Sequence, residues 1–297
     1  MAKKIVRKKT TTGPKRKTVK SRKKKKNSFE SFFTPARVAF MILLLLLVIS
    51  FSYLRNTHIP EKQYANDFEN WAIPETTLDG YTEQIISNKG YTVSYNSDFR
   101  NPNWVAYVLE RNELKGKKSK RTDKFTGDPL VAGKQATNAD YSKSGYDRGH
   151  LAPAADMAWS DKSMSESFYF SNMSPQLPAF NRGKWKDLED LTRKWADKES
   201  LLLIATGPVL KGPMKQIGKN SVSVPKYFYK VIIDPVLPER KGIGFVMENT
   251  KLQKPLRSYA VTIDSIERLT GINFFEALPD EIENKVESEL ILESWEW

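Results

Sequence analysis

The stretch SNMSPQLPAFNRGKWKDLEDL, at residues 171–191, tells most about the fold of this chain. Apolar residues recur at helical spacing from Lys184 to Lys198, which predicts a helix there. Asn181 precedes this helix at a natural N-cap position, and Glu189 lies eight residues later, about two turns along the same face. An amide and a carboxylate so placed suit an oxygen-ligand site for Mg²⁺. Plain capping by Asn181 and a solvated Glu189 is the simpler alternative.

The preceding stretch, YDRGHLAPAADM at residues 146–157, contains one of only two histidines in the chain. His150 follows Asp147 and Arg148 closely, and Gly149 between them allows close approach of another backbone. The other histidine, His58, lies outside any such group, and we interpret it as a surface residue. The composition around His150 supports a catalytic role and a structural role equally.

Strand and helix patterns alternate irregularly over the rest of the chain. Short apolar or alternating runs predict strands at 91–95, 104–110, 167–172, 201–207, 224–233 and 242–247, with a turn at 101–103. Residues 265–272 and the acidic stretch 276–290 predict C-terminal helices. Since helices and strands do not alternate as in a doubly wound fold, we expect an α+β domain.

The N-terminal region has a composition of its own. Residues 38–54 contain no charged side chain and would form a helix of roughly 26 Å, which predicts a single transmembrane helix. A buried core helix and a cleaved signal peptide are the alternatives. Basic residues before a span tend to stay cytoplasmic, so we expect the N-terminus inside and the rest of the chain on the exoplasmic side, periplasmic or extracellular. The predicted organisation is a basic cytoplasmic tail at 1–37, the anchor at 38–54, a linker at 55–84 and a folded domain at 85–297.

Charge and cysteine content limit the interpretation further. The net charge of +13 comes from the tail, where 15 Lys and Arg residues face one acidic residue, which leaves the remaining chain at −1. Overall basicity therefore says nothing about what the folded domain binds. Cysteine is absent, which excludes disulfides and thiolate metal sites.

Taken together, these motifs resemble the DNA/RNA non-specific endonuclease family, the ββα-metal (His-Me finger) nucleases that include endonuclease G. The resemblance covers roughly residues 85–290. It rests on DRGH at 147–150 followed, at matching spacing, by Asn172, Pro175-Gln176, Asn181, Trp185 and Glu189.

The resemblance implies a role for each motif residue. His150 corresponds to the general base, Asn181 to the direct metal ligand and Asn172 to a residue that supports the site from the second shell. Glu189 corresponds to the glutamate that holds metal-bound waters. Arg121, in RTDKF, corresponds to a phosphate-contacting arginine, and Arg148 to the supporting arginine of DRGH.

The expected activity is hydrolysis of phosphodiester bonds in DNA and RNA without sequence preference, yielding 5′-phosphates. The expected cofactor is one Mg²⁺, with Mn²⁺ as a substitute. Expected partners are DNA and RNA substrates, the lipid bilayer through residues 38–54, and a second copy of the chain, since family members often dimerise. The run Lys115–Lys124 is either part of a positive groove or an exposed loop. A catalytically inactive, membrane-anchored nucleic-acid-binding protein is the alternative function.

Overall fold

This computed structural model describes residues 35–56, 68–76, 82–116 and 118–297. The chain divides into two compact units, Met1–Ile59 and Pro60–Trp297. Residues 1–34 of the predicted basic tail, and His58, lie outside the described residues.

The first unit contains helix α1 (Pro35–Asn56), so the apolar run at 38–54 is helical as expected. The apolar side chains from Phe40 to Leu46, and that of Val48, are exposed. Within the described ranges, no helix is both long enough and apolar enough to cross a membrane. The predicted membrane span over 38–54 is therefore not supported, although the helix itself is present.

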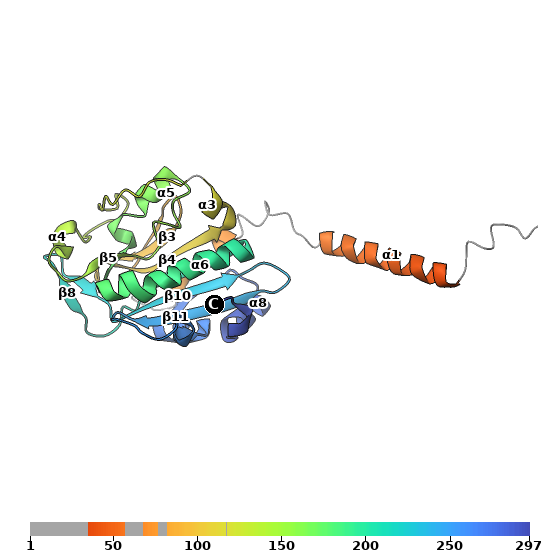
Figure 1. Cartoon of the computed structure of the whole chain (residues 1–297). Helices are drawn as coiled ribbons and strands as arrows, with labels where there is room; N and C mark the ends of the chain where they lie inside the picture. The colour runs from red at the N-terminus through yellow and green to blue at the C-terminus, as the bar shows by residue number, and fades with distance from the viewer. Residues whose placement is uncertain (1–34, 57–67, 77–81, 117) are drawn as a thin grey trace, which may run out of the picture. The chain divides into compact units, whose positions relative to one another are not determined.

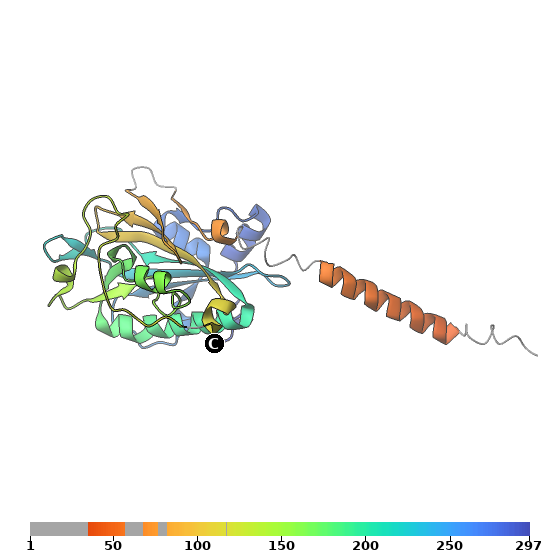
Figure 2. The same ribbon diagram turned by 90° about the horizontal axis from the view of Figure 1, so that it is seen from above.

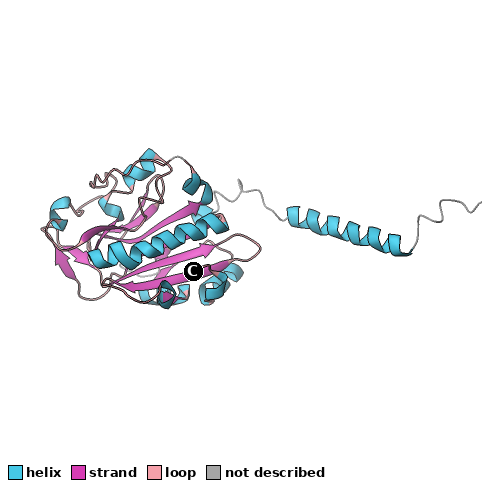
Figure 3. Cartoon of the chain, viewed as in Figure 1, coloured by secondary structure: helices cyan, strands magenta, loops and turns pink. Residues whose placement is uncertain are grey.

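An antiparallel sheet forms the centre of the second unit, where seven of the described strands lie side by side (Figure 3). Their order across the sheet is β12 (Ala260–Val261), β11 (Lys241–Glu248), β10 (Tyr227–Asp234), β7 (Leu201–Pro208), β4 (Asn101–Glu110), β3 (Thr92–Asn96) and β2 (Gln84–Ser87). The central strands are buried on both faces, which explains why their sequences are almost continuously apolar. The structure thus confirms a mixed domain built on a large antiparallel sheet.

Helices cover both faces of this sheet (Figures 1 and 2). They are α6 (Lys186–Glu199) on one face, and α7 (Ile263–Thr270) with α8 (Asp280–Ser288) on the other. Side chains of β4 alternate between the two cores: Val105 and Tyr107 pack with α6, whereas Trp104 and Ala106 pack with α7 and α8. The two faces of one sheet therefore lie in separate environments.

Smaller elements complete the domain. These are β1 (Glu75–Thr76), α3 (Arg111–Lys115), α4 (Asn138–Tyr141), β5 (Asp147–His150), α5 (Asp161–Glu166), η1 (Phe170–Asn172), β6 (Met173–Gln176), η2 (Phe180–Trp185), β8 (Lys215–Ile217), β9 (Val222–Val224), η3 (Leu256–Tyr259), β13 (Ile272–Asn273) and η4 (Leu292–Ser294). Strand β5 pairs with β6, β8 with β9, and β1 with β13. Phe68 and Ala72 are buried in the core that α7 and α8 cover. The predicted linker at 55–84 therefore includes residues of the folded unit.

The turn predicted at 101–103 is wrong, because these residues begin β4. The side chains of Asn101 and Asn103 are buried rather than solvated. Asn103 Nδ2 donates to Ser94 Oγ at 2.9 Å, and Asn101 Nδ2 donates to the Ser223 carbonyl at 3.0 Å. The chain turns earlier, where Arg100 has a left-handed φ of 53°.

The strand predicted at 167–172 is also wrong. Within it, Tyr169 forms a single isolated bridge with Thr126, and the residues that follow form the 3₁₀ helix η1. Apolar side chains suited to a strand are used here to fill small cores, since Phe168 and Phe170 are both buried. The strand begins only at Met173.

Candidate active site

The two-stranded ribbon of β5 and β6 holds the DRGH motif. The antiparallel register sets His150 opposite Met173 and Asp147 opposite Gln176. Gly149 is required for this packing, because a Cβ there would lie 2.2 Å from Gln176 Oε1. Gly149 therefore allows the ribbon to pack closely against the buried side chain of Gln176, which fixes the direction of the His150 side chain.

The His150 ring packs against two phenylalanine rings that also contact each other. Its ring centroid is 4.9 Å from that of Phe168, in an edge-to-face arrangement, and 5.6 Å from that of Phe125. Its Nε2 is buried and has no hydrogen-bond partner among the described residues. Burial, with Arg121 and Arg148 nearby, lowers the pKa of His150 to about 3. His150 is therefore neutral near pH 7, with one buried nitrogen unused by the fold.

Arg121 and Arg148 each contact one of the two rings that pack against His150. The guanidinium carbon of Arg121 is 4.9 Å from the Phe168 ring, and that of Arg148 is 4.2 Å from the Phe125 ring. Arg148 Nη1 donates to Asn138 Oδ1 at 2.6 Å, and Arg121 Nε forms an exposed ion pair with Asp123 at 2.7 Å. The structure thus brings both predicted arginines to His150.

Asn181 lies inside the π-helical turn η2, so the N-cap interpretation is wrong. Its Nδ2 donates to Asp147 Oδ2 at 2.9 Å. Arg182 donates to both carboxylate oxygens of Asp147, at 2.8 and 2.7 Å. Burial alone would raise the pKa of Asp147, but these hydrogen bonds outweigh it and lower that pKa. Asp147 therefore holds Asn181 in place and leaves the Oδ1 of Asn181 without a hydrogen-bond partner among the described residues.

Asn172 is completely buried, and its side chain orders the loop after His150. Its Oδ1 accepts from the Ala152 amide at 2.9 Å, while its Nδ2 donates to the carbonyls of Ala152 at 2.9 Å and Ser167 at 2.8 Å. The amide group is fully used by the backbone. This geometry fits a supporting residue and does not fit a direct metal ligand.

Glu189 lies on α6, and its charged neighbours are Lys230, Asp156, Arg193 and Asp190. Burial raises its pKa, while Lys230 and Arg193 act in the opposite direction. In the described part of the chain, no hydrogen bond or ion pair joins Glu189 to His150 or Asn181. Its carboxylate therefore lies near Lys230 and Arg193 without forming a direct ion pair with either side chain.

The prediction from sequence missed Arg193 and Lys230. Arg193 pairs with the buried Asp156 at 2.6 Å, and Tyr107 donates to the same carboxylate at 2.9 Å. Lys230 is fully buried, with its Nζ 5.3 Å from the Trp185 ring. Two signals were available: Arg193 follows Glu189 at i+4, and Lys230 is the one charged residue in the apolar run YFYKVII.

The donor atoms at this site fit a magnesium ion. A free amide oxygen on Asn181 and a carboxylate on Glu189 are both hard oxygen ligands, which Mg²⁺ prefers together with water. The described residues offer no thiolate at all, and His150 packs against aromatic rings rather than among other ligands. An oxygen-only site of few protein ligands is therefore the kind of metal site that these residues support.

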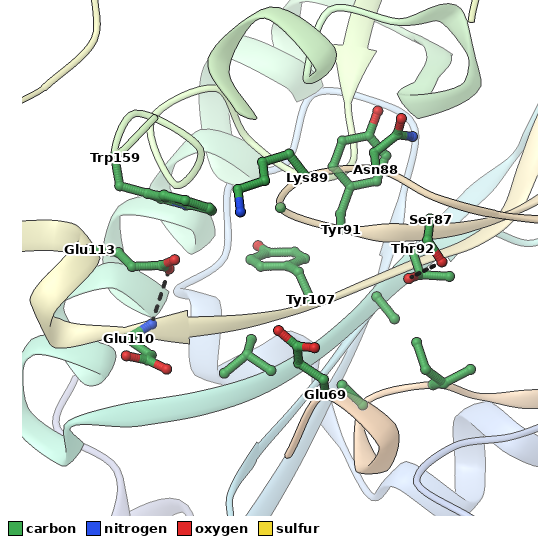
Figure 4. A pocket seen from close by; sticks show the side chains of 15 residues that line it. Glu69, Ser87, Asn88, Lys89, Tyr91, Thr92, Tyr107, Glu110, Glu113 and Trp159 are labelled. Carbon is green, nitrogen blue, oxygen red and sulfur yellow. Dashed lines mark hydrogen bonds between the residues drawn. The ribbon is translucent and has the colours of Figure 1, made fainter. Parts of the chain in front are cut away.

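A cavity of about 380 Å³ lies elsewhere in the domain. Figure 4 shows the side chains of Lys89, Glu113 and Trp159 around the ring of Tyr107. Lys89 Nζ lies 5.6 Å from the Trp159 ring, and burial raises the pKa of Glu113 to about 7. None of the predicted site residues lines this cavity, so it is separate from the site at His150.

Comparison with known proteins points to one family of nucleases. The profile of the DNA/RNA non-specific endonuclease family matches residues 71–281. Mitochondrial endonuclease G of Homo sapiens is 37% identical over 205 residues, which cover 64% of this chain and 69% of that protein. Nuclease C1 of Cunninghamella echinulata var. echinulata is 34% identical over 215 residues, or 67% and 85% of the two chains.

The fold is also similar to that in a crystal structure of the EndoG/EndoGI complex, which concerns the mechanism of EndoG inhibition. The TM-score is 0.67 at 29% sequence identity, over 75% of this chain and 95% of the other. The profile match alone spans well over half of the chain. This chain is therefore an endonuclease that belongs to the DNA/RNA non-specific endonuclease family.

Proposed function

We propose that this endonuclease hydrolyses phosphodiester bonds of DNA and RNA in a metal-dependent reaction without sequence preference, with His150 as general base. The observation that carries the proposal is the environment of His150. A neutral imidazole has a buried, unpartnered Nε2 and packs against two rings that each contact an arginine. A structural histidine would use that nitrogen in a hydrogen bond.

The low pKa of His150 fits a base that acts on an anionic substrate. In the free protein, burial and the two arginines hold this pKa at about 3, so the ring is unprotonated. A phosphodiester bound between Arg121 and Arg148 would offset their charge and raise the pKa of His150 toward the working range. The histidine would then remove a proton from the attacking water with good driving force.

The other residues divide between substrate and metal. Arg121 and Arg148 would bind the phosphate and stabilise the charge that develops on it, as preorganised donors do. Asn181 would bind Mg²⁺ directly, Glu189 would bind it through water, and Asn172 would support the loop after His150. A bound Mg²⁺, or Mn²⁺ in its place, supplies Lewis-acid stabilisation of the phosphate and of the 3′-oxygen leaving group.

Recognition of the phosphate backbone accounts for the lack of sequence preference, because phosphates are the same at every step. The run Lys115–Lys124 includes Arg121 and is rich in positive charge, and most of its described residues are exposed. We propose that it forms one wall of the substrate groove. The products are proposed to carry 5′-phosphates, which end-labelling of the cleaved strands would check.

The predicted setting of the domain is a separate proposal. Basic residues precede the apolar run at 38–54, which is why we expect the nuclease domain on the exoplasmic side. Carbonate extraction and protease accessibility of the full chain in cells would test the membrane attachment and the side. Sedimentation of the purified protein would test the expected homodimer.

The central test compares histidine variants of the full chain. Wild type, His150→Asn and His58→Asn would each be incubated with supercoiled plasmid and with RNA, with Mg²⁺ and with chelator. His58→Asn is the matched control, since it makes the same change at the only other histidine. We expect wild type and the control to degrade both substrates only with metal. His150→Asn should lose about 10²–10⁴-fold in rate.

The alternative of an inactive nucleic-acid-binding protein predicts a different result. In that case wild type would retard DNA in a gel but leave both substrates intact. Undiminished cleavage by His150→Asn would reject His150 as the base while leaving the family assignment in place.

A further inference from the structure

A second group of acidic residues lies on the opposite face of the central sheet. Asp264 and Glu267 are one helical turn apart on α7, and Glu287 lies near the end of α8. Figure 2 shows the two helices on the side of the sheet away from α6. This group is therefore separated by the sheet from α6 and its Glu189.

The three carboxylates converge on one point. One oxygen from each of Asp264, Glu267 and Glu287 lies within 4.8 Å of the other two. Since α7 and α8 are packed together, the oxygens come from two elements that the fold holds in fixed positions. Such spacing is what a small cation needs in order to contact all three oxygens at once.

Glu287 is the residue that points to a ligand. It is only 5% exposed, and its Oε1 is buried with no hydrogen-bond partner among the described residues. The four neighbours that act on it most strongly are all carboxylates, namely Glu267, Glu283, Asp264 and Glu276. A buried, unpaired carboxylate surrounded by others is costly unless a positive charge is supplied.

Partners already present near the group leave this charge largely uncompensated. Arg268 reaches Asp264 at 3.7 Å, but the arginine side chain is 70% exposed. The Phe274 amide donates to Glu267 Oε1 at 2.8 Å. Both partners serve the two α7 residues, and neither contacts Glu287.

We propose that Asp264, Glu267 and Glu287 bind a divalent cation, Ca²⁺, which joins α7 to α8 as a structural ion. Ca²⁺ accepts several carboxylate oxygens in irregular geometry, whereas Mg²⁺ demands near-octahedral geometry and retains its waters. The site is independent of the metal proposed at Asn181, since the two share no residue. Its role is to stabilise the C-terminal helices and not to take part in cleavage.

The test compares the thermal stability of four full-length proteins: wild type, Glu287→Gln, the control Glu281→Gln and Asn181→Ala. Glu281 is an exposed acidic residue on the same helix. In chelator near pH 7.5, Glu287→Gln should melt at a higher temperature than wild type, because the amide is neutral without having to take up a proton on folding. Ca²⁺ at about 100 times its Kd should raise the Tm of wild type, Glu281→Gln and Asn181→Ala by about 5 °C. It should leave Glu287→Gln nearly unchanged.

Calorimetric titration with Ca²⁺ provides the second readout. We expect Asn181→Ala to retain one Ca²⁺ site and the double variant Asn181→Ala/Glu287→Gln to have none. An equal Tm response of wild type and Glu287→Gln would overturn the proposal. So would a wild type that shows no response at millimolar Ca²⁺, because the carboxylates would then be sharing protons instead of a cation.

Discussion

Glu189 and Glu287 are carboxylates on helices that cover opposite faces of one sheet, yet only Glu189 has cations among its strongest neighbours. Around Glu189, Lys230 and Arg193 supply positive charge from within the protein. Around Glu287, the strongest neighbours are all acidic. Burial raises the pKa of both side chains, so the difference between them lies in the charges of their neighbours.

The difference teaches how a buried charge is accommodated. On the α6 face, the cations near Glu189 belong to the protein itself, and they lower the pKa of Glu189 against the effect of burial. On the α7 and α8 face, compensation has to come from a proton or from an ion in solution. The second arrangement makes stability depend on the medium.

Removing positive charge from the α6 face should have the largest effect. The double variant Arg121→Met/Arg148→Met takes away the two guanidinium groups that flank His150, and we expect kcat/KM on plasmid DNA to fall by about 10²–10³-fold. Arg257→Met, at an exposed arginine, is the matched control. Full activity of the double variant would show that the arginines have no part in binding the phosphate.

Loosening Asn181 should have the next largest effect. Asp147→Asn removes the carboxylate that accepts hydrogen bonds from Asn181 and Arg182. Changes of this kind behind a metal ligand typically cost about 10–100-fold in metal affinity. We expect the Mg²⁺ concentration for half-maximal cleavage to rise accordingly. Asp187→Asn, at an exposed residue on α6, should leave that concentration unchanged.

Removing the buried cation near Glu189 should shift the pH profile of cleavage. Lys230→Met removes the buried cation that lowers the pKa of Glu189. Glu189 would then ionise at higher pH, so the acid limb of the activity profile should move upward by about one pH unit. Unfolding by urea should change little, since Lys230 Nζ has no hydrogen-bond partner among the described residues. Lys226→Met, at an exposed lysine, is the control. If Lys230→Met leaves the acid limb at the same pH as in wild type, Lys230 does not control the ionisation of Glu189.

The two faces should also respond to pH with opposite sign. The pKa of His150 falls from 6.5 to about 3 on folding, so its contribution to stability is complete above pH 6.5 and is lost as the pH falls toward 3. The pKa of Glu287 rises from 4.5 to about 9, so its contribution is complete below pH 4.5 and is lost as the pH rises toward 9. Each group should change the free energy of unfolding by about 1 kcal/mol per pH unit within its window.

Urea titrations in chelator at pH 5.5, 6.5, 7.5 and 8.5 would measure both contributions. Relative to wild type, His150→Asn should be less sensitive to acid and Glu287→Gln less sensitive to alkali. Parallel curves for all three proteins would mean that neither group is as strongly coupled to folding as its surroundings indicate.

Much of the sheet and the helix after the motif could be predicted from local patterns. The runs at 91–95, 201–207 and 242–247 are long enough and apolar enough to identify β3, β7 and β11, and helical spacing identifies α6. Prediction failed where polar side chains are buried by contacts distant in sequence. Asn101 and Asn103 resemble turn residues, but they bond to Ser223 and Ser94 inside the fold.

The site divides in the same way. The motif residues could be named from their spacing and from the family that they resemble, but the rings around His150 could not. Phe125 and Phe168 come from segments before and after the motif, and only folding brings them together. On the far face, the spacing of Asp264 and Glu267 is visible in the sequence, but the approach of Glu287 is a tertiary contact.

The pairing of Glu75 with Asn273 has a consequence for the order of folding. It joins the beginning of the domain to a position beyond α7, and every proposed catalytic residue lies in the part of the chain between these two positions. Contacts of such range form late, because the entropy of closing a long loop must be overcome first. The hairpins of β3 with β4 and of β10 with β11 should therefore form early and this clasp last. During folding, a protease site placed between β12 and β13 should therefore stay accessible until β1 pairs with β13, and it should be protected after that.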